Sequence, residues 1–429
     1  MIEAQNTNDK IKAKKVYAPI FVLLLLLQLY LPSFKINIVV QVAALLFFCF
    51  AESKILISKK FLGQFTSVFL LLILGFIGTL LHKYRAFNII KDLFHFIKPA
   101  VGILIGYLFF RKMNDFSLFI KTIVIASVLS AFIHLYIVFF ITDFFSGQIS
   151  NIRLYTKDNF LELFAIFFLV FYKKYEGKQL FSNYLFRYFS LGIISLSCIL
   201  YFSRTMIVIA ILLLVTIYGY TKITKKSLVL ASIGVVLLSL LFVYLNNANI
   251  RRDKEGIEGF LYKIKMAPGE IFVGNINREN HADLWDHWRA YEAKRAYALM
   301  EENPSSFVVG TGHGSLVNLK FFVPVPDNLK GMKYVSELHN GYMYVFYKIG
   351  AIGILLYLFI LLRWYSYIYK RNTMVNMLVS AIGTIYLFSS ITITGIFNGR
   401  DIIIFILGAA LYYSESAAKT KAEVQEIQQ

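Results

Sequence analysis

The chain has 429 residues, of which 58% are hydrophobic and 17% aromatic, and its mean hydropathy is +0.63. No water-soluble domain of this size needs so much apolar surface, so the composition predicts an all-α integral membrane protein. The net charge of +19 does not indicate a nucleic-acid partner, because the basic residues are concentrated in short connections between apolar runs.

Twelve apolar runs predict twelve membrane-spanning helices. They cover approximately residues 17–34, 36–51, 61–81, 96–110, 118–143, 159–173, 184–202, 205–220, 227–245, 341–362, 374–394 and 400–414. Residues 17–245 would hold spans one to nine, and residues 341–414 spans ten to twelve. Residues 1–16 and 415–429 are polar terminal segments, and no small-residue cleavage site follows the first run, so we expect no removed signal peptide.

The charges of the connections predict the orientation. Lysine and arginine gather in the terminal segments and in every second short connection. The positive-inside rule then places both termini in the cytoplasm. The long segment 246–340 contains twelve basic and twelve acidic residues. It would lie on the outer side, although a loop of this length crosses the membrane regardless of its charge.

Within the long segment, residues 282–303 have apolar side chains at helical spacing, and Pro304 would end that helix. The glycine-rich stretch Gly310–Gly314 predicts a flexible turn. Residues 320–338, which contain two prolines, are expected to be irregular.

Arg204 is the only charge in the 34 residues from Tyr188 to Thr221. As one helix this run would be about 50 Å long, which exceeds a hydrocarbon core of about 30 Å. We therefore predict a break at Ser203–Arg204. An arginine there either extends toward the lipid head groups or binds an anion in a polar cavity.

His339 and Asn340 lie where the long segment returns to an apolar run. At that depth a histidine is either an interfacial residue bonded to a neighbouring carbonyl or a proton acceptor near neutral pH. Arg289 lies on the predicted loop helix, where a solvated pair with Glu292 at i,i+3 is the simpler interpretation. Arg278 and Arg295 are equally plausible anion ligands by charge.

Other chemistries find no support in the motifs. The stretch Gly310–Gly314 lacks the Gly-Lys-Ser/Thr of a phosphate-binding loop and has no preceding strand. The loop histidines lack metal-ligand spacing with a carboxylate, so we expect neither a catalytic metal nor a cofactor. No internal repeat is visible, which argues against the alternative of a polytopic lipid or polysaccharide transporter.

Three stretches resemble the bacterial O-antigen ligase and O-antigen polymerase family of polytopic membrane glycosyltransferases. They are Ser203-Arg204-Thr205 at the start of a span, Trp288–Gly314 with its arginine-bearing helix, and His339-Asn340 followed by a span with Gly350 and Gly353. The resemblance covers about residues 150–360 by motif.

This resemblance implies a donor glycan on a polyprenyl (undecaprenyl) diphosphate carrier and a site on the periplasmic face of the inner membrane. By position, Arg204 and His339 match the family's diphosphate-binding arginine and activating histidine. Arg289 is chosen as the second arginine, with Arg278 in reserve. A weaker substrate-binding role is expected for Arg153, and also for Asn340 and Tyr342.

The residues do not decide which acceptor is used, because the family contains two kinds of enzyme. A ligase would transfer the glycan to lipid A–core, and a polymerase to another carrier-linked repeat unit. Both fit every residue named, and we favour the ligase. The reaction would be a single inverting displacement without a metal.

Overall fold

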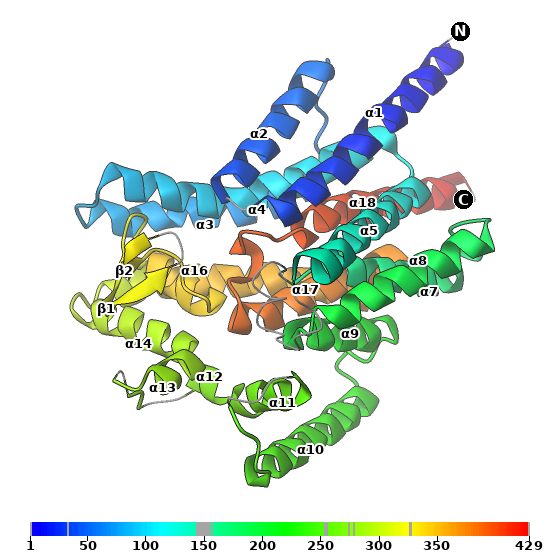
Figure 1. The fold of residues 1–429 in the computed structure, drawn as a ribbon. Coiled ribbons are helices and arrows are strands. Elements are labelled where there is room, and N and C mark those ends of the chain that lie inside the picture. The colour runs from blue at the N-terminus through cyan, green and yellow to red at the C-terminus, as the bar shows by residue number, and fades with distance from the viewer. Residues whose placement is uncertain are drawn as a thin grey trace.

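The computed structural model describes residues 2–31, 34–142, 156, 158–252, 256–272, 275–277, 279–325 and 328–427. This part of the chain is mostly helical (Figure 1). The helices that form or border the bundle are α1 (Ile2–Tyr30), α2 (Phe34–Ala51), α3 (Lys59–Leu80), α4 (Ala86–Met113), α5 (Phe116–Tyr136), η1 (Ile137–Ile141), α7 (Phe160–Glu176), α8 (Tyr184–Leu200), α9 (Arg204–Ile217), α10 (Lys225–Asn247), α16 (Gly341–Tyr365), η3 (Ser366–Tyr369), α17 (Met374–Thr392), η4 (Gly395–Phe397) and α18 (Ile403–Ile427).

Each of the twelve predicted spans overlaps one of these helices. Among the described residues, however, eight helices are long and apolar enough to cross a membrane. The other four predicted spans overlap α7, α8, α9 and the apolar first part of α18, which are not among these eight helices. Helices α7, α8 and α9 have 17, 17 and 14 residues, so they extend about 21–26 Å, less than a hydrocarbon core of about 30 Å. The described part of the chain is mostly helical and has eight helices able to span a membrane, so the fold class is confirmed in outline, and the count of twelve is not confirmed.

The bundle is packed tightly where glycines face a neighbouring helix. A Cβ atom added to Gly106 of α4 would lie 2.1 Å from the carbonyl oxygen of Phe405, and one added to Gly408 of α18 would lie 2.1 Å from that of Ile103. Such small-residue contacts let membrane helices approach closely. Both ends of the chain lie at one end of the bundle, and the β-hairpin lies at the other (Figure 1).

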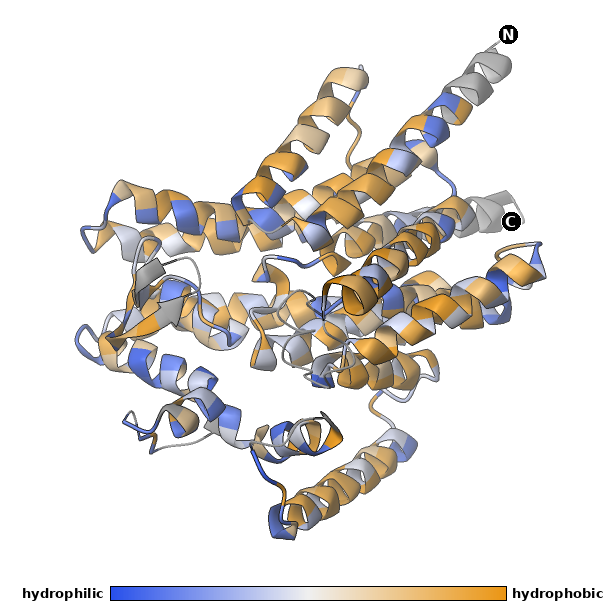
Figure 2. Cartoon of the chain, viewed as in Figure 1, coloured by the Kyte–Doolittle hydropathy of each residue, from blue (hydrophilic) through white to orange (hydrophobic). Residues whose placement is uncertain are grey.

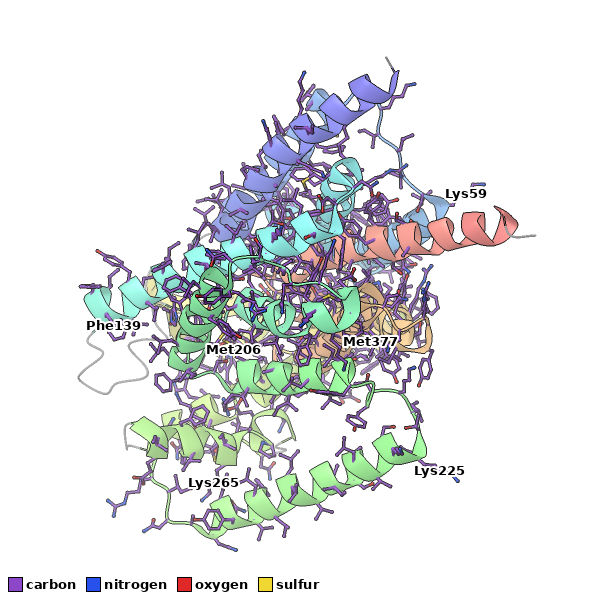
Figure 3. The ribbon with its side chains drawn as sticks, turned by 90° about the vertical axis from the view of Figure 1, so that its right-hand side faces the viewer. Lys59, Phe139, Met206, Lys225, Lys265 and Met377 are labelled. Atoms are coloured by element: carbon purple, nitrogen blue, oxygen red, sulfur yellow. The ribbon has the colours of Figure 1, made fainter. Side chains whose placement is uncertain are left out.

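Helix α10 differs from the rest because it stands away from the bundle (Figures 1 and 3). Only 6% of its apolar window is buried inside the protein, and its residues are mostly hydrophobic between two hydrophilic ends (Figure 2). A helix that is apolar all round and unburied is typical of a membrane span surrounded by lipid. It leads into the long segment through α11 (Gly256–Met266) and α12 (Gly269–Phe272).

The long segment has more regular structure than its sequence indicates. The predicted helix over 282–303 is two helices, α13 (His281–Asp286) and α14 (Trp288–Glu301), with His287 between them, and α15 (Ser306–Val309) follows. Residues 320–338 were expected to be irregular, and this was wrong. They contribute to an antiparallel hairpin of β1 (Val317–Val325) and β2 (Asn328–Val335).

The hairpin escaped prediction because its ladder has register shifts and β1 includes a proline. Its inner face is nevertheless apolar, with Val317 and Leu319 fully buried. The Tyr291 hydroxyl on α14 donates to the Leu319 carbonyl at 2.5 Å, and Arg295 Nε donates to the Asn318 carbonyl at 3.0 Å. The hairpin therefore supports α14 from one side.

The glycine turn after α15 is buried rather than flexible. The amide groups of Thr311 and Gly312 donate to the carbonyls of Tyr347 and Lys348 on α16, at 2.8 and 3.0 Å. Gly310 and Gly350 both have positive φ, 79° and 72°, and a Cβ atom on Gly350 would lie 2.4 Å from the Val308 backbone. α16 is thus interrupted where the turn packs against it.

A fully buried ion pair stabilises the same junction. Lys348 Nζ lies 2.6 Å from Asp92 Oδ2 of α4 and donates to the Ser315 carbonyl at 2.6 Å. The same Asp92 oxygen accepts from the Gly314 amide at 2.7 Å. Two transmembrane helices and the turn therefore share one pair of charges, which fixes the end of the long segment against the bundle.

Candidate functional site

A cavity of about 620 Å³ opens where the long segment meets the bundle. Its walls come from five parts of the chain: the α1–α2 junction, residues 156–160, the start of α9, α14 with the approach to α16, and the connection before α18. The lining residues are Leu31, Phe34, Asn37, Thr156, Asp158, Phe160, Arg204, Thr205, Arg289, Glu337, Leu338, His339, Ile393, Thr394, Asn398, Gly399, Arg400, Asp401 and Ile402. The structure therefore brings together Arg204, Arg289 and His339.

Arg204 is the first residue of α9, as the predicted break requires. α8 ends at Leu200, and the side chain of Ser203 caps α9 by accepting from the Met206 amide at 3.3 Å. Phe202, between the two helices, has a positive φ of 47°. This strained connection turns the chain so that the Arg204 side chain reaches the cavity instead of continuing along one long helix.

Arg204 and Arg289 share a single carboxylate, that of Glu270 on α12. Arg204 Nη2 lies 2.9 Å from Glu270 Oε1, and Arg289 Nη1 pairs with Glu270 Oε2. Arg289 therefore does not pair with Glu292 along its own helix. Two guanidinium groups that hold one carboxylate form a single anion-binding position.

The two arginines differ in their remaining donors. Arg289 Nε is buried and has no hydrogen-bond partner in the described part of the chain. Arg204 Nη1 donates to the Lys263 backbone carbonyl of α11. Both side chains are only partly exposed, 24% and 28%. In such surroundings ionic hydrogen bonds are stronger than they would be in open water.

His339 is bonded to a buried carboxylate that the sequence did not single out. Its Nδ1 lies 2.9 Å from Glu292 Oε2 and 3.0 Å from Oε1, and its backbone amide donates to Oε2 at 3.0 Å. The Glu292 side chain is 2% exposed, whereas that of His339 is 58% exposed. Because a carboxylate accepts, Nδ1 carries the proton and Nε2 is left as the acceptor.

The surroundings of His339 also change its acidity. The hydrogen bond to Glu292 raises the pKa of His339, and this effect exceeds the opposing effect of burial. Glu337, two residues earlier, also lines the cavity and accepts from the Thr394 hydroxyl at 3.0 Å. Burial raises the pKa of Glu337 above that of an ordinary glutamate. Both shifts favour the protonated form of each group relative to the free side chain.

Two other predicted site residues, Asn340 and Tyr342, have structural contacts outside the cavity lining. Asn340 caps α16, since its Oδ1 accepts from the Met343 amide at 2.9 Å, and the Tyr342 hydroxyl donates to the Leu387 carbonyl at 2.7 Å. Neither lines the cavity. Arg153 and Arg278 lie outside the described residues.

Glu270, Glu292 and Arg400 were missed by sequence reasoning. The two glutamates are among twelve acidic residues of the long segment, and no local pattern distinguishes them. The sequence contained a weak indication of a functional role for Arg400, because it is an arginine between two apolar runs. Lys348, the single charge in its apolar run, gave the same indication, and it belongs to the buried pair with Asp92.

Residues 189–358 match a family model described as O-antigen ligase. The matched interval runs from α8 into α16 and contains Arg204, Glu270, Arg289, Glu292 and His339. It lies within the interval 150–360 that the motifs predicted, so the family resemblance is confirmed there. No curated protein matches the chain.

Proposed function

We propose that this chain, whose residues 189–358 carry the O-antigen ligase family region, is a membrane glycosyltransferase of the ligase type. It would transfer a preassembled glycan from an undecaprenyl diphosphate carrier to lipid A–core on the periplasmic side of the inner membrane. One observation carries the proposal. A two-arginine anion position and a carboxylate-bonded histidine line the same cavity.

The arginine pair suits the diphosphate of the donor. Guanidinium groups are always charged and bind phosphate oxygens through two parallel hydrogen bonds. As the bond between the sugar and the diphosphate breaks, negative charge develops on the leaving group. Arg204 and Arg289 would stabilise that charge in a partly desolvated site. The proposed reaction therefore assigns this task to the two arginines and needs no divalent metal.

His339 would activate the acceptor. Its Nε2 takes the proton of the acceptor hydroxyl while the acceptor oxygen forms a bond to the anomeric carbon. The bond from that carbon to the diphosphate oxygen breaks, and the carrier diphosphate leaves with the electron pair. A single displacement of this kind inverts the anomeric centre. Glu292 orients the ring and stabilises the imidazolium that forms, as the third member of a catalytic triad does.

A polymerase remains the second candidate, because the family region covers both activities. The same groups would bind the same donor, and the acceptor would be a second carrier-linked repeat unit. The two candidates differ in the product that accumulates when the enzyme is missing, so a gene deletion separates them.

The deletion strain would be analysed by running its surface polysaccharide on a gel. A ligase defect leaves full-length glycans on the polyprenyl carrier and none on lipid A–core. A polymerase defect leaves lipid A–core bearing a single repeat unit. An unchanged pattern would contradict both and return the transporter alternative to consideration.

Variants of the purified enzyme in proteoliposomes test the chemistry. His339→Ala should abolish transfer or reduce it severely, with unchanged membrane insertion. His82→Ala is the matched control, because His82 does not line the cavity. Transfer should survive EDTA, and a loss of activity that one divalent ion restores would overturn the metal-free mechanism.

A further inference from the structure

The connection between η4 and α18, residues 398–402, forms one wall of the cavity and has no role in the chemistry above. It contributes Asn398, Gly399, Arg400, Asp401 and Ile402. Arg400 also lines a small adjoining cavity with Leu29, Tyr30, Thr156, Asp158, Asn159 and Tyr201. Asp158 lines both cavities as well, and among the described residues no ion pair joins it to Arg400. The guanidinium group of Arg400 is therefore placed between the main cavity and this recess.

A fully buried lysine holds this connection in place. Lys98 of α4, 1% exposed, donates from Nζ to the carbonyls of Asn398 and Gly399 at 2.6 and 2.8 Å. Gln28 of α1 donates to the same Gly399 carbonyl at 2.9 Å. A charge inside a membrane bundle is costly and is generally retained at a functional site. Two helices thus fix the backbone of the two residues immediately before Arg400.

The neighbouring acid does not neutralise Arg400. Asp401 Oδ2 accepts from the Tyr386 hydroxyl at 2.5 Å, and Oδ1 accepts from the Ile403 amide at 2.9 Å. The one hydrogen bond of Arg400 to a side chain uses its backbone amide, which donates to Asn398 Oδ1 at 3.1 Å. Across the described ranges, no ion pair or hydrogen bond of its guanidinium group is present.

Arg400 differs in this respect from the other two arginines of the cavity. Arg204 and Arg289 already share the carboxylate of Glu270. The half-buried guanidinium of Arg400 has no such counter-ion among the residues that the structure describes. A partly desolvated guanidinium on a fixed backbone favours a bidentate anion, either a phosphate or a carboxylate.

We propose that Arg400 forms a second anion subsite, which binds a phosphate or carboxylate group on the saccharide of the acceptor. The subsite is separate from the diphosphate position at Arg204 and Arg289. The inference rests on the proposed function, which assigns the donor to that pair and the acceptor hydroxyl to His339. It adds that the enzyme selects a negatively charged acceptor.

The test is Arg400→Gln, assayed with purified enzyme in proteoliposomes at varied donor and varied acceptor concentrations. The KM for the acceptor should rise about tenfold or more, while kcat changes less than twofold. The KM for the donor and inhibition by inorganic pyrophosphate should be unchanged. Arg400→Lys should recover part of the loss because it keeps the charge and loses the planar fork. Arg85→Gln, an exposed arginine that does not line the cavity, is the control.

Two modified acceptors distinguish the sources of the anion. If the anion is a phosphate, dephosphorylated acceptor raises KM for the wild-type enzyme and has no further effect on Arg400→Gln. If it is a carboxylate, the same pattern appears with acceptor whose carboxyl groups have been esterified. Weaker pyrophosphate inhibition of Arg400→Gln would overturn the proposal and make Arg400 a third diphosphate ligand. Unchanged kinetics would overturn it as well.

Failure of the inference can be told from failure of the proposed function. Binding of methyl phosphate and of inorganic pyrophosphate is measured without turnover. The subsite predicts that Arg400→Gln loses saturable methyl phosphate binding, while Arg204→Gln loses pyrophosphate binding. If the wild-type protein transfers no glycan but shows this pattern, the proposed function fails and the subsite stands. If it transfers glycan and Arg400→Gln behaves as wild type, the subsite alone fails.

Discussion

Glu292 accepts two hydrogen bonds from His339, one from ring Nδ1 at 2.9 Å and one from the backbone amide at 3.0 Å. The carboxylate therefore fixes the main chain at the start of α16 as well as the orientation of the ring. Because Glu292 lies on α14, it also ties the helix that carries Arg289 to the histidine. A change at Glu292 should affect both the rate and the pH dependence of transfer.

Glu292→Gln should lower kcat by about 10²-fold, within the range expected for general-base assistance. Only neutral His339 acts as a base, so activity falls as the pH drops through its pKa. The bond to Glu292 raises the pKa of His339. Its loss should therefore move the acidic limb of the kcat/KM profile to lower pH. Glu301→Gln, on the exposed side of α14, should leave the profile unchanged.

If the kcat/KM profile of Glu292→Gln does not move, or moves to higher pH, then Glu292 does not raise the pKa of the group that limits activity at acidic pH. A fall in activity without a shift would limit Glu292 to positioning of the chain.

Glu270 occupies the position that the donor diphosphate would take. Its removal by Glu270→Gln should lower the KM for the donor several-fold and strengthen inhibition by inorganic pyrophosphate. The reason is that the anion would no longer have to displace a carboxylate from Arg204 and Arg289. Glu258→Gln on α11, a partly exposed glutamate that pairs with neither Arg204 nor Arg289, serves as control. A higher donor KM would instead mean that Glu270 organises the two arginines.

Arg204→Lys should reduce kcat/KM for the donor by about 10-fold to 100-fold although the charge is kept. A lysine ammonium cannot reproduce the planar two-bond contact that a guanidinium makes with phosphate. Steady-state kinetics at varied donor concentration measure the effect. Full activity of the lysine variant would reduce Arg204 to a side chain anchored near the lipid head groups.

The buried pair of Asp92 and Lys348 predicts an asymmetric effect on stability. Removal of one partner, by Asp92→Asn or Lys348→Met, leaves an uncompensated charge or polar group at a site with no exposure. Each should destabilise the protein by about 3–5 kcal/mol. The double variant Asp92→Asn with Lys348→Met should be less destabilised than the sum of the two single variants. Thermal unfolding of purified protein in detergent would measure this, and additive losses would contradict the pairing.

The helices of the bundle were predictable because hydropathy records burial in lipid directly. Arg204 and His339 were predictable for a related reason, since each is a polar group at the boundary of an apolar run. The structure places both at the cavity, and their roles stay predictions. Partners far away in sequence were not predictable. Glu292 lies 47 residues from His339 and Glu270 lies 66 from Arg204. Each pairing depends on how α12 and α14 fold over the bundle.

The hairpin shows a second limit. Its two strands are irregular in register, so alternation of apolar residues is weak, and Pro324 argued against a strand. The packing of Val317 and Leu319 against α14 decided the outcome instead.

The interruption of α16 at Gly350, where the glycine turn 310–314 packs against the helix, has a consequence for biosynthesis. The turn 310–314 leaves the ribosome before α16, yet its amides bond to carbonyls of Tyr347 and Lys348. The amides of the turn therefore lack these hydrogen-bond acceptors until α16 has been inserted beside α4. His339 lies just before α16, and the wall at Arg400 lies beyond it along the chain. The cavity is completed only near the end of translation, so a truncated chain carries both arginines without a working centre.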